Sequence, residues 1–226
     1  MSLLLSQIVQ VFRKDLLIEW RGKARFVALA AFAATVLLLM SFAIGPDSAQ
    51  LREHAAGYLW VAVLLASTQL LAQSFHTEIE GGALEGLRLL PVFAPSLFYG
   101  KALANWLFLV LLVILALPLS VILFDLTIEG PLWMLGLAVV LGAAGVSAPG
   151  TLYAALTARA PAQQLMLPLL LFPLLVPTLL ASVKITTLVF LGDPMGQSWG
   201  WLGMLACFDL VFWMFGGVLF WKLVES

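Results

Sequence analysis

The segment from Phe75 to Pro91, FHTEIEGGALEGLRLLP, is the one long polar interruption between two hydrophobic segments that are each long enough to cross a bilayer. Helical spacing places four apolar residues on one stripe, namely Ile79, Ala83, Leu84 and Leu87. The polar residues between them are Glu78, Glu80, Glu85 and Arg88. This pattern predicts a short amphipathic helix that lies on the membrane surface or docks onto a partner protein. A solvated loop with one helical turn is the alternative.

Glycine and proline set the limits of this amphipathic segment. The adjacent Gly81 and Gly82 permit a tight bend, and Pro91 stops a helix before the chain returns to the membrane. We therefore expect a compact element that joins two membrane spans.

The composition is that of an integral membrane protein. Of the 226 residues 63% are hydrophobic and only 10% are charged, with a mean hydropathy of +1.08, whereas a soluble domain carries about 25% charged residues. This composition leaves no separate soluble domain, so residues 1–226 are expected to form one all-α membrane domain. A net charge of -1 gives no case for nucleic-acid binding, and the single Cys207 excludes an internal disulfide and a cysteine metal cluster.

Six apolar runs are predicted to cross the membrane, at about 26–44, 56–75, 97–124, 132–156, 163–183 and 201–221. Residues 3–25 precede them with apolar residues at helical spacing but too many charges to span, which predicts an amphipathic helix in the interface. A basic flank of the first span is the alternative. For the connection from Lys184 to Gly200 the sequence permits two predictions, a loop or a re-entrant segment around Thr186 to Leu191. Gly142, Gly145, Pro149 and Gly150 indicate either close helix approach or a local break in the fourth span.

The basic residues predict the orientation. Nine lie on the side of the two termini and of the Phe75–Pro91 segment, and only Arg52 and Lys184 lie on the other side. Because cytoplasmic loops carry the excess of Lys and Arg, we expect both termini in the cytoplasm.

Asp209 is the least expected residue, since it lies in the middle of the sixth span. A carboxylate there costs a few kcal/mol, so it should face the bundle interior or a partner helix. Two interpretations stay open: a polar relay or partner contact, and a protonated, hydrogen-bonded structural aspartate.

Motifs of nucleotide or metal chemistry are missing from the sequence. It has no Gly-rich phosphate loop, no nucleophile constellation and no zinc-ligand spacing. We therefore expect no catalytic site and no metal site in this chain, and we assign it no bound cofactor. If transport is driven by ATP, the motor is another polypeptide.

The order of elements resembles the ABC-2-like exporter permeases, with an interfacial helix, six spans and an amphipathic segment between spans two and three. Within that group the chain resembles the family of permease subunits B of the haem exporter used in bacterial cytochrome c maturation. The strongest match is Phe75 to Pro91, with an acidic residue, Gly82, Leu84-Glu85 and the terminal proline. Other matching residues are Phe12-Arg13-Lys14-Asp15-Leu16 with Glu19 and Arg21, Gly45-Pro46, Trp60-Val61-Ala62 with Leu64-Leu65-Ala66, and Lys101-Ala102 with Trp106. The resemblance covers nearly the whole chain, but no motif anchors the residues after Lys184.

The resemblance implies a multi-pass subunit of the bacterial inner membrane that pairs with a separate ABC ATPase and a second permease copy. The other implied partners are a haem-handling membrane subunit, a small single-span subunit and a periplasmic haem chaperone. The complex would either deliver haem to this chaperone or release the chaperone once it is loaded with haem. ATP would bind to the partner subunit, and haem is a possible cargo. His54, in the loop expected outside, is a candidate axial ligand of haem iron, with an ordinary interfacial histidine as the alternative. A permease for a lipid, drug or ion and a non-transporting scaffold for maturation factors are the other functions to test.

Such a permease needs a cytoplasmic helix that seats in a groove of the ATPase. The resemblance assigns this role to residues 76–91, with the coupling residues Glu78, Glu80, Gly81, Gly82, Leu84, Glu85, Leu87, Arg88 and Pro91. The glutamates offer acidic contacts to a basic groove, while Leu84 and Leu87 would fill its apolar floor.

Overall fold

The computed structural model describes residues 2–45, 48–80, 94–158, 160 and 162–225. These residues form α-helices joined by short connections, and none of them is in a β-strand. The helices are α1 (Ser2–Arg21), α2 (Lys23–Ile44), α3 (Ser48–Glu80), α5 (Ala94–Leu123), α6 (Leu132–Thr157), α7 (Gln163–Leu191) and α8 (Ser198–Glu225). Within the described residues, six helices are long and apolar enough to cross a membrane, all but α1. The expectation of an all-α membrane protein with six spans is confirmed.

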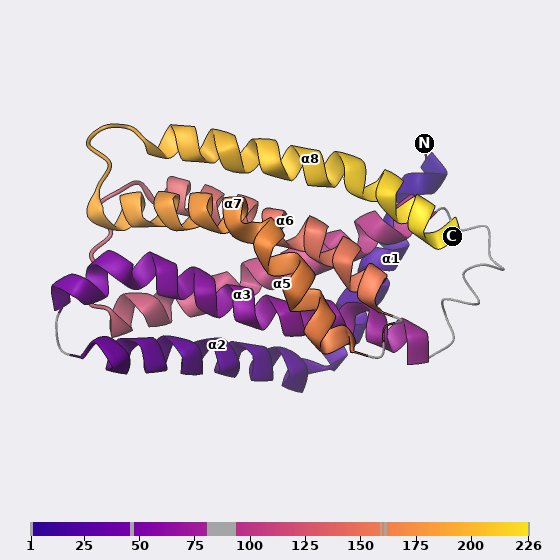
Figure 1. Ribbon diagram of the computed structural model, residues 1–226, viewed down its shortest axis with the longest axis horizontal. Helices are drawn as coiled ribbons and strands as arrows, with labels where there is room; N and C mark the ends of the chain where they lie inside the picture. Colours follow the sequence, from indigo (N-terminus) through magenta and orange to yellow (C-terminus); the bar gives the residue numbers. More distant parts are fainter. Residues whose placement is uncertain (1, 46–47, 81–93, 159, 161, 226) are drawn as a thin grey trace.

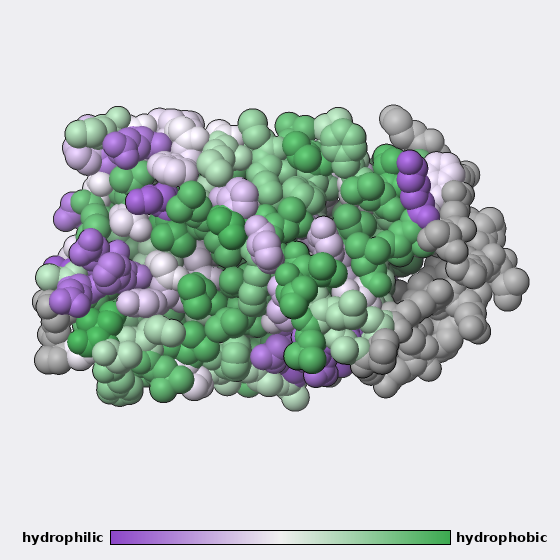
Figure 2. Space-filling view, in the orientation of Figure 1, coloured by the Kyte–Doolittle hydropathy of each residue, from purple (hydrophilic) through white to green (hydrophobic). Residues whose placement is uncertain are grey.

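The six spans run roughly side by side, and α1 crosses their direction at one end of the bundle (Figure 1). Both terminal helices reach that end, as do the last turn of α3 and the first turn of α5 (Figure 1). Apolar side chains dominate the middle of the molecule, and hydrophilic ones gather toward its ends (Figure 2). This distribution fits a bundle whose long axis crosses the bilayer.

Helix α1 is a separate helix that packs against α5. The break falls at Gly22, whose N–H donates to the carbonyl of Ile18 over 3.0 Å, so the helix ends at Arg21 rather than at residue 25. Close contact with α5 depends on Gly100, where a Cβ would lie 2.6 Å from the side chain of Val11. The predicted interfacial helix is thus docked onto the spans.

Helix α6 is the centre of the bundle and contacts α3, α5, α7 and α8. Its glycines make this possible: a Cβ on Gly142 would lie 2.3 Å from the ring of Trp60, and one on Gly150 would lie 2.5 Å from Leu71. The helix continues through Pro149. Of the two expectations for this run of small residues, close approach is therefore correct, because small side chains let neighbouring backbones come near.

The end of α7 and the start of α3 differ most from the expected boundaries. Helix α7 does not end at 183 but continues to Leu191. The connection 184–200, for which a loop and a re-entrant segment were the alternatives, is therefore mostly helix, and only 192–197 connect α7 to α8. Its added turns bury Ile185, Val189 and Phe190, while the exposed Lys184 extends from the helix surface, where a long side chain can bring its charge to the interface.

Helix α3 is also longer than expected and begins at Ser48 rather than near residue 56. Leu51 and Ala55 are buried against the core, and this burial extends the helix outward. Arg52 therefore lies in the first turns of α3, where it forms an exposed ion pair with Asp125.

Candidate functional site

The predicted coupling segment lies largely outside the described residues. Gly81, Gly82, Leu84, Glu85, Leu87, Arg88 and Pro91 all fall in 81–93. The backbone of Glu78 and Glu80 belongs to the last turns of α3, but their side chains are not described either. The assignment of 76–91 to a partner contact stays a prediction. What the structure describes is how the helices on either side of this segment are held.

Lys101 joins three helices at this end of the bundle. It lies two turns inside α5 and is 1% exposed. Its ammonium lies 3.1 Å from a carboxylate oxygen of Asp15 on α1 and donates to the carbonyl of Ser74 on α3 over 2.7 Å. It also lies 4.8 Å from the ring centre of Phe75. A buried charge must be paired and hydrogen-bonded, so these contacts determine where α1 and the end of α3 sit on α5.

A second set of hydrogen bonds extends this junction to α6. The side-chain amide of Asn105 donates to the hydroxyl of Ser74 over 3.3 Å and to that of Thr151 over 2.9 Å. The hydroxyl of Ser147 on α6 donates to the carbonyl of Ala102 over 2.6 Å. We call the set Asp15, Ser74, Lys101, Asn105, Ser147 and Thr151 the polar junction. It connects α1, α3 and α5 with the central helix.

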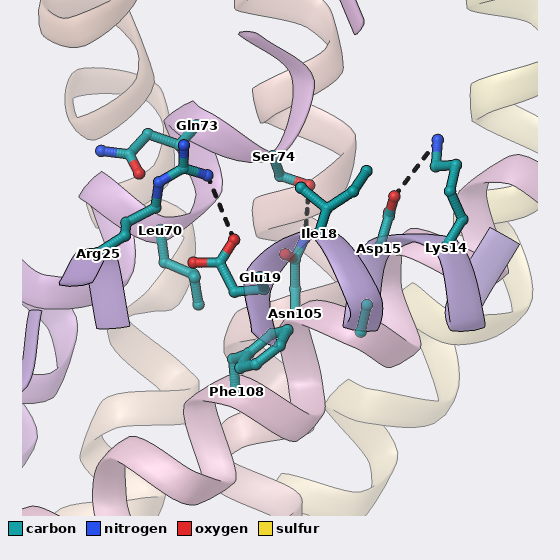
Figure 3. Close-up of a pocket in the computed structure, with 11 residues that line it drawn as sticks. Lys14, Asp15, Ile18, Glu19, Arg25, Leu70, Gln73, Ser74, Asn105 and Phe108 are labelled. Atoms are coloured by element: carbon teal, nitrogen blue, oxygen red, sulfur yellow. Dashed lines mark hydrogen bonds and ion pairs between the residues drawn. The ribbon is translucent and has the colours of Figure 1, made fainter. Parts of the chain in front are cut away.

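A cavity of about 210 Å³ lies beside the polar junction, between α1, α2, α3 and α5 (Figure 3). Glu19 of α1 and Arg25 of α2 form an ion pair of 3.3 Å at its edge, and this pair holds the corner between the two helices. Burial raises the pKa of the Glu19 carboxyl, and the neighbouring Arg25 guanidinium opposes that shift. Gln73 of α3 lines the same cavity and lies near Arg25 in the view of Figure 3.

Asp209 lies in the bundle interior, as its position in the sixth span predicted. It is 7% exposed and packs near Gly145 of α6 and Thr178 of α7. Its role is not decided by this placement.

His54 lies at the opposite end of the bundle, exposed in the second turn of α3. Its ring meets that of Tyr58 edge-on at 6.2 Å, beside a groove of about 370 Å³ that is also lined by Trp60, Leu179 and Val183. Among the described residues no three His, Cys, Asp or Glu side chains form a metal-binding group. Its assignment as a haem ligand stays a prediction.

The polar junction was not predicted from the sequence. In the sequence, Lys101 is one of the nine basic residues on the side of the Phe75–Pro91 segment, and Asp15 is one of several charges in residues 3–25. One signal was present, because a lysine that precedes more than twenty apolar residues of a span is placed where it must find an acidic partner or reach water. The spacing along the chain does not reveal which acid pairs with it.

Comparison with known proteins gives a match to one protein family over most of the chain. Residues 6–218 match the family model described as CcmB protein. The chain is 36% identical over 172 residues to heme exporter protein B of Rhodobacter capsulatus, covering 76% of this chain and 78% of that protein. It is 32% identical over 192 residues to heme exporter protein B of Pseudomonas aeruginosa, covering 84% and 85% of the two chains. The protein of the same name from Paracoccus denitrificans is 32% identical over 171 residues.

Proposed function

Because the chain belongs to the CcmB protein family, we propose that it is the membrane-spanning permease subunit of an ABC transporter complex for haem export in cytochrome c maturation. A separate ATPase subunit hydrolyses ATP. The permease uses that energy to deliver haem to a periplasmic haem chaperone or to release the loaded chaperone.

The polar junction is the observation that carries the mechanism. The 76–91 segment receives the movement of the ATPase, and along the chain it lies between the main part of α3 and the start of α5. Lys101 connects those two helices to each other and to α1. A displacement of the segment is therefore passed on to several spans together, because breaking a buried ion pair to move one helix alone costs about 3–5 kcal/mol.

The route continues into the bundle through α6. Asn105 and Ser147 join α5 to α6, and α6 contacts α3, α7 and α8 as well. Close-packed interiors transmit strain instead of absorbing it. Movement at the cytoplasmic end thereby changes the packing of the whole membrane domain.

We infer that both termini and the 76–91 segment face the cytoplasm, with the subunit in the bacterial inner membrane. The nine-to-two division of basic residues supports this orientation. The arrangement in Figure 1 is compatible with it, since α1, the C-terminal end of α8, the last turn of α3 and the first turn of α5 all lie at one end. The proposed partners are the ABC ATPase, a haem-handling membrane subunit, a small single-span subunit and the haem chaperone.

Affinity capture of the tagged full-length protein from mildly solubilised membranes tests this function, with partners identified by mass spectrometry. We expect an ABC ATPase and a haem-handling membrane subunit, and an unrelated tagged six-span protein serves as the control. Recovery of a different ATPase would retain the permease role and reject haem export. If no ATPase is recovered even after crosslinking in the membrane, the proposed function is wrong.

A further inference from the structure

Three buried oxygen-bearing side chains lie along one face of α6, with Asp209 and Thr178 beside Gly145 and Ser182 beside Gly142. Asp209 of α8 is 7% exposed, and Thr178 and Ser182 of α7 are fully buried. Among the described residues, neither carboxylate oxygen of Asp209 has a hydrogen-bond partner, and the two hydroxyl groups have none either. In an apolar environment an unpaired polar group costs free energy, and an unpaired charge costs far more.

The oxygen donors beside the carboxyl group do not suit a hard metal ion. A Cβ on Gly145 would lie 2.7 Å from Oδ1 of Asp209 and 3.0 Å from Oγ1 of Thr178, so even a methyl group does not fit there. A Cβ on Gly142 would lie 2.7 Å from Oγ of Ser182. Hard cations such as Ca²⁺ and Mg²⁺ take about six or more oxygen ligands. One carboxyl and two hydroxyl groups do not supply them.

No cationic side chain compensates Asp209 within the described part of the chain. Helices α5, α6 and α7 pack against α8. Their ionisable residues are Tyr99 and Lys101 on α5, Tyr153 on α6 and Lys184 on α7, and α8 itself adds Cys207, Lys222 and Glu225. Lys101 pairs with Asp15, Lys184 is exposed, and Lys222 lies more than three helical turns from Asp209.

We propose that Asp209 is an intramembrane proton-binding site that carries one proton while α6, α7 and α8 are packed together and exchanges it only when α8 moves away from Gly145. The carboxylate takes H⁺ from water to become a neutral carboxylic acid, and it returns H⁺ to water on opening. The neutral form removes the unpaired charge. Its O–H is a neutral donor, and the hydroxyl of Thr178 lies beside Gly145 as the Asp209 carboxyl group does. Proton binding at Asp209 is thus linked to closure of this helix junction, independently of the cargo.

Infrared spectroscopy of the full-length protein in lipid nanodiscs tests the bound proton. At neutral pH the wild-type protein should show the carbonyl stretch of a protonated carboxylic acid, and Asp209→Asn should lack it. Glu53→Gln is the control, since it removes an exposed carboxyl group and should change only carboxylate bands. Loss of carboxylate bands in Asp209→Asn would show that Asp209 is ionised and overturn the proposal. If Asp209→Asn does not accumulate in the membrane, aspartate-specific ¹³C labelling of the wild-type protein should shift the same acid band. An unshifted band would show that no aspartate carries the proton and would overturn the proposal.

Transfer to D₂O tests the link to helix packing. The acid band of the wild-type protein should shift slowly, because exchange requires the junction to open. In Gly145→Ala the added methyl group presses on Asp209 and Thr178, so the band should shift about ten-fold faster or more. Gly203→Ala on the same helix as Asp209, where a Cβ meets nothing within 4 Å, should exchange like the wild type. Immediate exchange in the wild-type protein would contradict gating by the helix junction.

Discussion

The ammonium group of Lys101 lies 3.1 Å from the carboxylate of Asp15, which is 86 residues earlier in the chain. The same ammonium donates to the carbonyl of Ser74. One buried lysine therefore holds α1, the end of α3 and the start of α5 together, next to the segment expected to contact the ATPase. The position of α1 on the bundle depends on this contact.

Replacing the lysine should loosen α1. Lys101→Met leaves Asp15 without its buried partner and the Ser74 carbonyl without this donor, so we expect a loss of about 3 kcal/mol in stability. Thermal unfolding in nanodiscs and faster hydrogen exchange across α1 measure the effect.

Lys14→Met is the matched control for Lys101→Met. Lys14 also lies near Asp15, at 3.4 Å, but its side chain is 46% exposed. Loss of such a pair costs less than about 1 kcal/mol. Equal effects of the two variants would show that the buried contact has no special role.

The contact of α8 with α5 should depend on Gly216. A Cβ there would lie 2.3 Å from the ring of Phe98, so Gly216→Ala should force the helices apart and cost about 1–3 kcal/mol. Gly203→Ala introduces the same methyl group into α8 where nothing lies within 4 Å, and it should stabilise the helix by up to about 1 kcal/mol. Unfolding midpoints of both variants measure these changes. A stabilised Gly216→Ala protein would be incompatible with the described packing.

The coupling role of the 76–91 segment can be tested at Glu85. Glu85→Lys reverses one of the acidic contacts proposed for the ATPase groove, and like charges across an interface cost several kcal/mol. We expect normal membrane insertion but ATPase activity near that of the isolated ATPase subunit, measured on the reconstituted complex. Glu53→Lys, on the exposed first turns of α3, should leave activity unchanged. Normal coupling in Glu85→Lys would remove the segment from the mechanism.

The start of α8 should be sensitive to acid. The carboxylate of Asp193 accepts hydrogen bonds from the hydroxyl and backbone N–H of Ser198 and from the N–H of Gln197, at 2.5, 2.9 and 2.9 Å. The bonds from Ser198 are the main cause of its lowered pKa. The folded state therefore favours the ionised form. The stabilisation is complete above the usual value of 3.8 and is lost as the pH falls through the lower folded pKa.

Asp193→Asn should remove that acid dependence. The amide side chain keeps one acceptor oxygen but carries no charge to titrate. The protection of the first-turn amides of α8 against hydrogen exchange, relative to the rate of an unfolded chain at the same pH, should then be lower at neutral pH and change little on acidification. An unchanged acid response would mean that another group causes it.

Much of the fold is readable from the sequence because it depends on local properties. Span number and helix type follow from runs of apolar residues long enough to cross a bilayer, and the glycines of α6 correctly indicate close helix approach. The predicted end of the fifth span at 183 is wrong, because the single charge of Lys184 does not stop the helix and residues beyond it are buried. The coupling residues from Glu78 to Pro91 stay predictions from the sequence.

Contacts between distant residues were decided by the tertiary structure alone. The sequence shows that Lys101 and Asp209 are charges in or beside apolar spans, and hydropathy explains why each needs compensation. It does not show that α1 brings Asp15 to Lys101, or that Asp209 lies beside Gly145 and Thr178 without a hydrogen-bond partner among the described residues. Apolar periodicity determines which residues leave water, whereas the pairing of buried polar groups depends on how the helices are placed and rotated against one another.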